Sequence, residues 1–411
     1  MRRGGPVGFI VLLLILAVLE YYSITSIRWM VRNMKAPWKS VVLGAYILLS
    51  LCWFASFFGF EYLRGSGWDR QILNFIFAFF MAFLMMKVVI SLFMVVDDVR
   101  RLGSWLWQQF NAPAAEGGTP ITRSDFIQRT ALIAGGTLFG LLTYGMFNRY
   151  RYKVNKIKLS FDKLPQGFKG MRFVQISDIH SGSFGDPSSV MKGVDIINEL
   201  KADLVLFTGD IVNSEHEEMD DYMDVFDKIK APMGVFSILG NHDYSDYSRN
   251  ASEEKKEGNR ALIRDIHKKL GWRLMIDEHL HLERNNDKLA LLGVGNISKS
   301  FHTYGDLSKA YDGLSADEFK ILMSHDPTHW DLEVNTDYQD IDLTLSGHTH
   351  GMQFGLNLPG FKWSPVQYMF KQWAGLYEKG AQKIYVNTGF GFLGYPGRVG
   401  FLPEITLFEF V

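Results

Sequence analysis

The sequence predicts a layered α/β domain that is preceded by an α-helical transmembrane region. Long apolar runs occupy the first 150 residues, whereas short apolar runs alternate with helical patterns in the remainder. The charge divides at the same place: residues 1–150 hold 14 Lys and Arg against 7 Asp and Glu, and residues 151–411 hold 29 against 37. We therefore expect a membrane region over residues 1–150 and a separate domain over residues 151–411.

The composition excludes several classes of protein. Hydrophobic residues make up 47% of the 411 residues and charged residues only 21%, which argues against a disordered chain and against a coiled coil. Cys52 is the single cysteine, so an intramolecular disulfide framework is excluded.

Four apolar runs predict transmembrane helices. They cover residues 7–27, 40–60, 72–96 and 130–147. The first three have the roughly 20 apolar residues that a helix needs to cross a hydrocarbon core of about 30 Å. The fourth run is weaker, and an export-signal core or a buried helix would also explain it. We expect about four transmembrane helices in a multi-pass protein of the cell membrane, with the lipid bilayer as a partner.

The segment between the third and fourth runs has a different character. Trp105 and Trp107 follow Arg100 and Arg101, a mixture that is typical of a helix lying in the membrane interface. Residues 112–120 are rich in Pro, Gly and Ala, which predicts a linker.

The basic residues of the short loops predict the orientation. The loop after the first run and the segment before the fourth each carry four Lys or Arg, whereas the other side of the membrane carries four in all. The positive-inside rule places the richer side in the cytoplasm, so the 151–411 domain is expected outside it. The basic stretch 149–158 argues for the opposite orientation.

Two opposite charges fall at matching depths within the apolar runs. Glu20 lies about two-thirds along the first run and Lys87 about three-fifths along the third, and both runs cross in the same direction. An unpaired charge at the bilayer centre costs about 2.5–3.5 kcal/mol on insertion scales, so an ion pair is predicted. The alternative is that Lys87 extends to the interface and Glu20 faces it directly.

The second half alternates buried strands with helices. Apolar runs that end in polar or glycine residues predict strands at 171–177, 203–209, 234–240, 289–295, 320–324, 343–347, 383–389 and 405–410. Helical patterns lie between them at 187–200, 217–230 and 252–270. This alternation is the pattern of a layered α/β domain.

Residues that can bind metal follow five of these strands. They are Asp178 and His180, Asp210, the run Asn241-His242-Asp243, His325, and the pair His348 and His350. Loops after buried strands are where a rigid sheet presents a site. Each of these motifs is weak alone, but five in this order, each after a predicted strand, point to one metal centre.

The mixture of ligands suits divalent first-row metals. Carboxylate and imidazole groups bind Mn, Fe and Zn, and two ions need a shared ligand, for which Asp210 is the natural candidate. Two ions about 3.5–4 Å apart can activate a water as a hydroxide and clamp a phosphoryl group. Such a centre attracts a phosphate anion.

With these ordered motifs, residues 153–411 resemble the calcineurin-like metallophosphoesterases. The resemblance implies a four-layer α-β-β-α sandwich with two divalent metal ions, Mn being the first choice and Fe or Zn the alternatives. It assigns one ion to Asp178, His180, Asp210 and His350, and the other to Asp210, Asn241, His325 and His348. It also implies that His242 acts as general acid or phosphate ligand and that Asp243 orients His242.

The chain is similar in particular to the membrane-anchored bacterial branch of this family. Some members are UDP-2,3-diacylglucosamine pyrophosphatases, so the resemblance implies a substrate that contains phosphate and is a candidate for being lipid-linked. Two residues depart from the pattern of these relatives: Met352 replaces the usual glycine, and Asn296 replaces an acidic residue. Both lie outside the ligand set and so concern the substrate rather than the metal.

An aromatic segment follows the last two histidines. Residues 354–377 hold several aromatic side chains with lysines among them, a mixture that suits a surface at the level of the lipid headgroups. The alternative is that these aromatic side chains pack into the core of their own domain.

Several other functions compete with a phosphoesterase. The domain could be a catalytically inactive receptor or scaffold, or the regulatory part of a transporter. The acidic balance of the second half argues against a nucleic acid substrate. Five other histidines are expected to be surface or helix residues: His267, His279, His281, His302 and His329.

Overall fold

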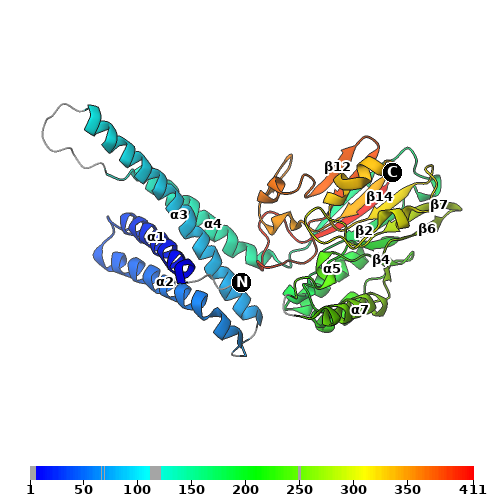
Figure 1. The fold of residues 1–411 in the computed structure, drawn as a ribbon, viewed down its shortest axis with the longest axis horizontal. Coiled ribbons are helices and arrows are strands. Elements are labelled where there is room, and N and C mark those ends of the chain that lie inside the picture. The colour runs from blue at the N-terminus through cyan, green and yellow to red at the C-terminus, as the bar shows by residue number, and fades with distance from the viewer. Residues whose placement is uncertain (1–5, 66, 69, 112–121, 249–250) are drawn as a thin grey trace. The chain divides into compact units, whose positions relative to one another are not determined.

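The computed structural model describes residues 6–65, 67–68, 70–111, 122–248 and 251–411. The chain forms two compact units, Met1–Tyr144 and Gly145–Val411 (Figure 1). The predicted linker over residues 112–120 lies outside the described residues.

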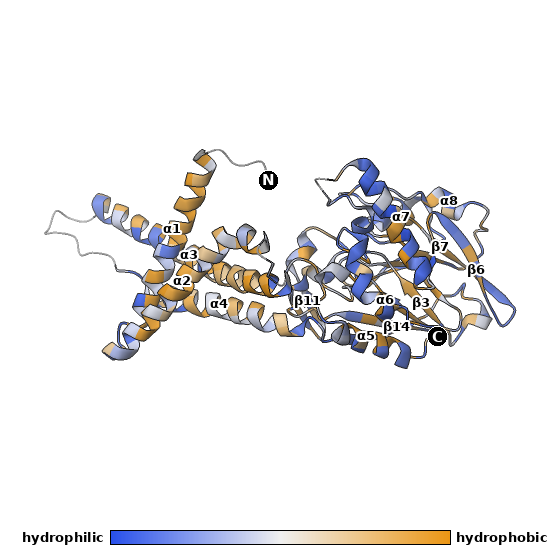
Figure 2. Ribbon diagram, turned by 90° about the horizontal axis from the view of Figure 1, so that it is seen from below, coloured by the Kyte–Doolittle hydropathy of each residue, from blue (hydrophilic) through white to orange (hydrophobic). Residues whose placement is uncertain are grey.

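The first unit consists of long apolar helices. They are α1 (Pro6–Met30), α2 (Ala36–Gly65), α3 (Arg70–Asn111) and α4 (Asp125–Gly145). All four are long and apolar enough to cross a membrane, and Figure 2 shows the hydrophobic residues that dominate them. The prediction of four transmembrane helices is confirmed.

Helix α3 is longer than the third apolar run. The segment 97–110, whose composition suits a helix in the membrane interface, is helical but continues α3 without a break, so that one helix of 42 residues runs through it. Its place at the interface stays a prediction. Asp97 and Asp98 pair with Arg100 and Arg101 one turn later, so the charges are compensated without a break in the helix. At 1.5 Å per residue α3 is about 60 Å long, roughly twice the thickness of a hydrocarbon core.

The predicted ion pair inside the helical bundle is confirmed. Lys87 Nζ lies 2.5 Å from Glu20 Oε2 and 3.1 Å from Ser50 Oγ, and the Lys87 side chain is only 1% exposed. Four aromatic rings lie within 6 Å of the ammonium group: Tyr46, Trp53, Phe54 and Phe83. Ion pairing and cation–π contacts together compensate the cost of removing this charge from water.

The second unit is built on two six-stranded sheets. The first has the order β1-β14-β2-β3-β4-β5 and the second the order β12-β13-β9-β8-β7-β6. The first sheet comprises β1 (Lys153–Leu159), β2 (Arg172–Ile176), β3 (Leu204–Phe207), β4 (Val235–Ser237), β5 (Arg273–Leu274) and β14 (Glu404–Phe410). The second comprises β6 (Glu278–Arg284), β7 (Asp287–Gly293), β8 (Lys320–Met323), β9 (Leu343–Ser346), β12 (Gly375–Lys379) and β13 (Gln382–Val386).

The structure confirms the predicted four layers, in which two sheets pack face to face and helices cover their outer faces. The alternation of side-chain direction along each strand explains how a sheet contributes to two cores. Phe173 and Leu204 belong to a core between the two sheets, together with Leu291, Ile321 and Leu343 of the second sheet. Their neighbours point to the outer faces, because successive side chains of a strand face opposite ways.

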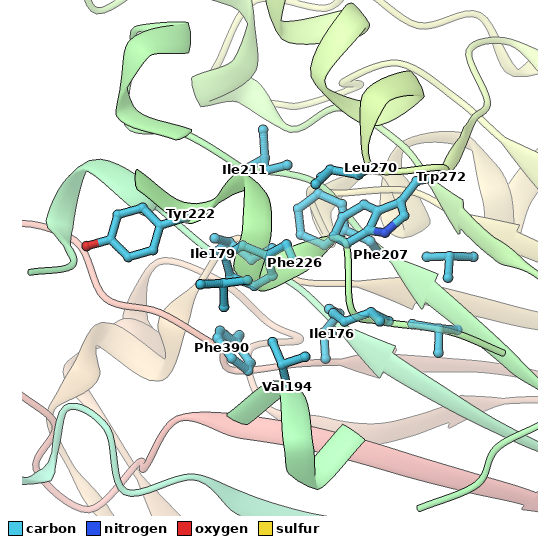
Figure 3. Close-up of a cluster of buried hydrophobic side chains, with 14 of the residues drawn as sticks. Ile176, Ile179, Val194, Phe207, Ile211, Tyr222, Phe226, Leu270, Trp272 and Phe390 are labelled. Carbon is cyan, nitrogen blue, oxygen red and sulfur yellow. The ribbon is translucent and has the colours of Figure 1, made fainter. Parts of the chain in front are cut away.

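Each outer face is covered by helices. On the first sheet the outward residues pack against α5 (Pro187–Glu199), α6 (Met223–Phe226) and α7 (Glu253–Lys269). Figure 3 shows this core, with Phe207 and Ile176 of the sheet among Val194, Phe226 and Trp272. On the second sheet, Leu292 and Leu322 pack against Leu307 of α8 (Leu307–Tyr311) and against Trp330.

The strand directions position the functional site. β2, β3 and β4 are parallel neighbours, and so are β7, β8 and β9. Parallel strands end at the same edge of their sheet, so the loops that follow them gather there.

Two histidines outside the motifs are fully buried rather than exposed. His267 lies in α7 and packs near Phe207 and Trp272, and neither ring nitrogen has a hydrogen-bond partner among the described residues. His329 contacts Ser324 Oγ through Nδ1 (2.8 Å) and Glu333 Oε1 through Nε2 (2.7 Å). Burial lowers the pKa of His267 to about 3.

We predict that His267→Phe makes the domain less sensitive to acid. The folded pKa of about 3 lies below the unfolded value of about 6.5, so the unfolded state binds the proton and stability falls as the pH drops below about 6.5. The loss is about 1.4 kcal/mol per pH unit, or about 2 kcal/mol at pH 5. Melting temperatures in detergent between pH 7.5 and 5 should therefore fall less in the variant than in the wild type. The exposed His302→Phe is the control, and an equal fall in all three proteins would contradict the prediction.

Candidate metal centre

The structure brings the predicted ligands together from five loops. The loops follow β2, β3, β4, β8 and β9, and the side chains that they present are largely buried. Three sets have side-chain ligand atoms within 4.8 Å of one another: Asp178, His180 and His350; His180, Asp210 and His242; and Asp210, His325 and His348. Asn241 lines the same cavity as Asp210.

Asp210 lies between the sets. Its Oδ2 is 3.1 Å from His325 Nε2 and 3.5 Å from His180 Nε2, whereas Asp178 Oδ1 is 3.2 Å from His350 Nε2. Asp210 therefore has the position that a carboxylate shared by two ions requires.

Unusual backbone conformations aim these side chains. Five predicted ligands have a positive φ between 51° and 71°: Asp178, His180, Asp210, His348 and His350. Such residues cost of order 1–3 kcal/mol each and cluster at functional sites. Glycines make room beside them, since a Cβ at Gly240 would collide with the Asp210 carboxylate and one at Gly347 with that of Asp178.

The electrostatics of the cluster favour a cation. Burial disfavours the charge of Asp178 and Asp210, but the neighbouring imidazoles hold the pKa of both carboxyls well below the usual range. Burial also opposes a charge on His325, yet the Asp210 carboxylate raises its pKa to about 10, whereas burial lowers the pKa of His180 to about 3. The two carboxylates thus keep their negative charge and need positive charge beside them.

Unpartnered atoms show that the residues fit metal ions. Asn241 Oδ1 is buried and makes no hydrogen bond within the described part of the chain. His180 Nε2 and His350 Nε2 are also buried, and although they lie 3.5 Å and 3.2 Å from carboxylate oxygens, they make no hydrogen bond of suitable geometry. A buried polar atom without a partner costs about 1–3 kcal/mol. All three are atoms that divalent cations accept as ligands, so bound cations would remove this cost.

His242 lies at the edge of the cluster. Its ring lies almost parallel to that of Tyr247, with centroids 4.2 Å apart. Nδ1 is 2.7 Å from the carbonyl oxygen of Asn213 and so donates its proton there, which leaves Nε2 as the nitrogen available to a ligand.

The expectation that Asp243 orients His242 is wrong. The buried Asp243 carboxylate accepts hydrogen bonds from the backbone N–H groups of Asp210 (2.8 Å), Ile211 (2.9 Å) and Gly240 (2.9 Å). These bonds fasten the loop after β3 to the loop after β4. Burial and the Asp210 charge raise the pKa of Asp243 to about 7, against these amide donors.

The cluster opens into a cavity of about 280 Å³. Besides five of the predicted ligands, its lining includes Tyr247 and Phe301, which no sequence pattern indicated, and Met369 and Phe370 of the aromatic segment 354–377. The Phe301 and Phe370 rings both make edge contacts with His348. The cavity therefore combines a metal cluster with an apolar wall.

Arg398 is a further residue that sequence patterns did not indicate. It is fully buried, and its guanidinium donates to the carbonyl oxygens of Thr388 (2.6 Å), Gly389 (3.1 Å) and His350 (3.3 Å). Its backbone N–H donates to the carbonyl of Gly145, the last residue of α4. Arg398 thus links the start of the second unit to a ligand loop.

Met352 has the backbone conformation that glycine usually adopts. Its φ is 54°, a conformation that glycine adopts without strain, and its side chain is exposed. The chain therefore keeps the turn after His350 with Met352 at the position where the family resemblance led us to expect glycine.

Comparisons with known proteins agree with this geometry. Residues 3–149 match a family model described as "Probable Calcineurin-like phosphoesterase, transmembrane domain", and residues 171–352 match the model "Calcineurin-like phosphoesterase". The "Uncharacterized metallophosphoesterase YkuE" of Bacillus subtilis is 30% identical over 282 residues, which cover 68% of this chain and 91% of that protein.

Two other relatives are similar. The "Transmembrane protein with metallophosphoesterase domain" of Danio rerio is 30% identical over 276 residues, 65% of this chain, and the match spans only 59% of that protein's length. The "Phosphodiesterase YaeI" of Escherichia coli is 28% identical over 296 residues, which cover 71% of this chain and all of that protein.

We predict that Tyr247→Phe weakens metal binding while the fold persists. Asn241 Nδ2 donates to Tyr247 Oη (2.8 Å), which leaves Asn241 Oδ1 free for a cation. Loss of such a partner of a metal ligand typically costs 10–100-fold in metal affinity. Titration of the metal-free protein with Mn²⁺ measures the change.

The matched control is Tyr304→Phe, which removes a hydroxyl that donates to Asp246 instead. Equal Mn²⁺ affinity in Tyr247→Phe and the wild type would show that the Asn241 amide needs no orientation.

Proposed function

Because the chain belongs to the calcineurin-like metallophosphoesterase family, we propose that it is a membrane-anchored phosphoesterase with two divalent metal ions. It hydrolyses a phosphoester or pyrophosphate bond. The observation that carries this function is the convergence of the seven predicted ligand residues from five loops, five of them lining one cavity, with unpartnered ligand atoms among them.

The side chains divide into two ligand sets. Asp178, His180, Asp210 and His350 would hold one cation, and Asp210, Asn241, His325 and His348 would hold the other. When bound, two such ions lower the pKa of a water and neutralise the charge of the phosphoryl group. Mn²⁺ is the first candidate, and Fe and Zn share its preference for these ligands.

His242 acts on the leaving group as a general acid or on the phosphoryl group as a hydrogen-bond donor. Its Nδ1–H is fixed on the Asn213 carbonyl and its ring is held against Tyr247, so the Nε2 atom has a defined position in the cavity. In the imidazolium form, which carries a proton on Nε2 as well as on Nδ1, it would donate that Nε2 proton to the departing oxygen or a hydrogen bond to the phosphoryl group. Asp243 keeps the loops that carry Asp210 and His242 at a fixed separation.

The substrate is lipid-linked. The protein has transmembrane helices, and an anchored enzyme gains effective concentration for a substrate confined to the same surface. Phe301, Met369 and Phe370 give the cavity an apolar wall beside the metal cluster, which suits a molecule with a phosphate and an apolar part.

The second unit lies on the extracytoplasmic side of the cell membrane. The excess of basic residues in the loop after the first span and before the fourth supports this orientation. We expect an alkaline phosphatase fused at the C-terminus to be active, since that reporter works only outside the cytoplasm. Activity of a fused reporter that works only in the cytoplasm would reverse the orientation.

We predict that Asp210→Asn and His242→Ala fail in different ways. Asp210→Asn removes the charge shared by both ligand sets, so both the metal content and the hydrolysis of a phosphodiester should be lost. His242→Ala should keep its metal but lose about 10²–10⁴-fold in rate, the usual contribution of a general acid. Metal analysis and turnover of the purified full chain measure both.

Exposed residues of the same types supply the controls, Asp195→Asn on α5 and His302→Ala. Full metal occupancy with normal turnover in Asp210→Asn would refute the assignment of the site.

A further inference from the structure

Six exposed apolar side chains of the second unit lie within residues 352–369. Met352, Leu356, Leu358, Phe361, Tyr368 and Met369 are all exposed, with Tyr368 at 78% and Met369 at 70%. Other aromatic residues of the segment behave differently, since Trp373 and Phe370 pack with Val366 and Phe401. Within residues 354–377, some side chains are therefore exposed, as a membrane-facing surface requires, whereas others pack into a small core of their own domain.

A short hairpin displays part of this apolar surface. β10 (Leu356–Leu358) and β11 (Phe361–Trp363) form a separate two-stranded sheet in which Leu356 pairs with Trp363 and Leu358 with Phe361. Paired residues share a face, so these four side chains lie on one face of the hairpin.

The opposite face of the hairpin is polar. Asn357 pairs with Lys362 there. In an ordinary hairpin the apolar face packs on a core, but here Leu356, Leu358 and Phe361 are 49%, 56% and 53% exposed. Contiguous exposed apolar surface of this kind marks an interaction site.

We propose that this apolar face, together with Tyr368 and Met369, docks onto the lipid bilayer that the chain's own helices span. The second unit cannot leave that membrane, because it begins at Gly145, where α4 ends, and β1 starts only eight residues later at Lys153. Eight extended residues reach at most about 28 Å. The unit therefore always faces a bilayer surface at short range.

The composition of the surface fits lipid better than protein. The exposed aromatic and aliphatic side chains match the apolar boundary of a membrane, and Lys371, which is exposed beside Met369, matches its anionic headgroups. A second copy of the chain is a poorer occupant, because a stable protein interface involves roughly 20–30 residues a side. Six clustered apolar residues fall well short of that number.

The docking has a consequence for catalysis that rests on the proposed function. Met369 belongs both to the exposed surface and to the lining of the metal cavity. A docked surface therefore places the mouth of the cavity at the headgroups, where a lipid-linked substrate can enter without leaving the membrane.

The test uses the full chain with Cys52→Ala, which removes the single cysteine. One new cysteine is introduced by Leu358→Cys or Asn357→Cys, labelled with the fluorophore NBD, and the protein is reconstituted into phosphatidylcholine vesicles that contain a doxyl-labelled lipid. Leu358 and Asn357 are neighbours on opposite faces, so NBD at 358 should be quenched several-fold more strongly than NBD at 357. Leu262→Cys, at an exposed apolar position on α7, supplies the distant control.

Equal quenching at the three positions would overturn the docking surface. The proposal would also be overturned if protection of the label at 358 depended on the protein concentration rather than on the doxyl lipid. A second copy of the chain would then cover the apolar face of the hairpin. In a separate assay, Leu358→Ser with Phe361→Ser should slow turnover of a lipid-linked phosphoester and spare a soluble diester. If the wild type hydrolyses neither substrate, the proposed function fails while the quenching result still decides the docking.

Discussion

Two buried carboxylates that must stay charged are the constraint on which the second unit depends. Asp178 and Asp210 are almost fully buried, and the imidazoles beside them hold the pKa of both carboxyls low. Burying a charge is tolerated only when opposite charge lies close by. Three features hold the Asp178 and Asp210 carboxylates where bound cations can compensate their charge. They are the positive-φ backbone at the ligands, the glycines that make room for the carboxylates, and the Asp243 carboxylate that fastens two loops together.

The fold meets this constraint through strand direction. Parallel strands in both sheets carry their loops to one edge, and the core between the sheets fixes the distance between the loops. The membrane region also contains a buried charge, that of Lys87. It is compensated within the helical bundle by Glu20 and by surrounding aromatic rings. In both units a buried charge dictates which neighbours are acceptable.

The sequence pattern predicted a layered α/β domain, the spans and the meeting of the ligands, since each depends on local pattern: alternation, apolar length, and polar residues at strand ends. The number of layers followed only from the family resemblance. The sequence also predicted the Glu20–Lys87 pair, because helices crossing one bilayer share a depth scale. The sequence did not predict contacts that depend on long-range packing. Asp243 bonds to backbone amides instead of His242, and Tyr247 and Arg398 act through contacts that no motif encodes. The end of α3 was also missed, since its charged residues pair along the same helix.

The central claim is that the strand-end cluster holds two cations that share Asp210. Electron paramagnetic resonance of the full chain loaded with Mn²⁺, combined with metal analysis, tests it most directly. Two manganese ions per chain and the multiline spectrum of a spin-coupled pair are the predicted result. One ion per chain with the spectrum of an isolated Mn²⁺, or none retained, would contradict the account.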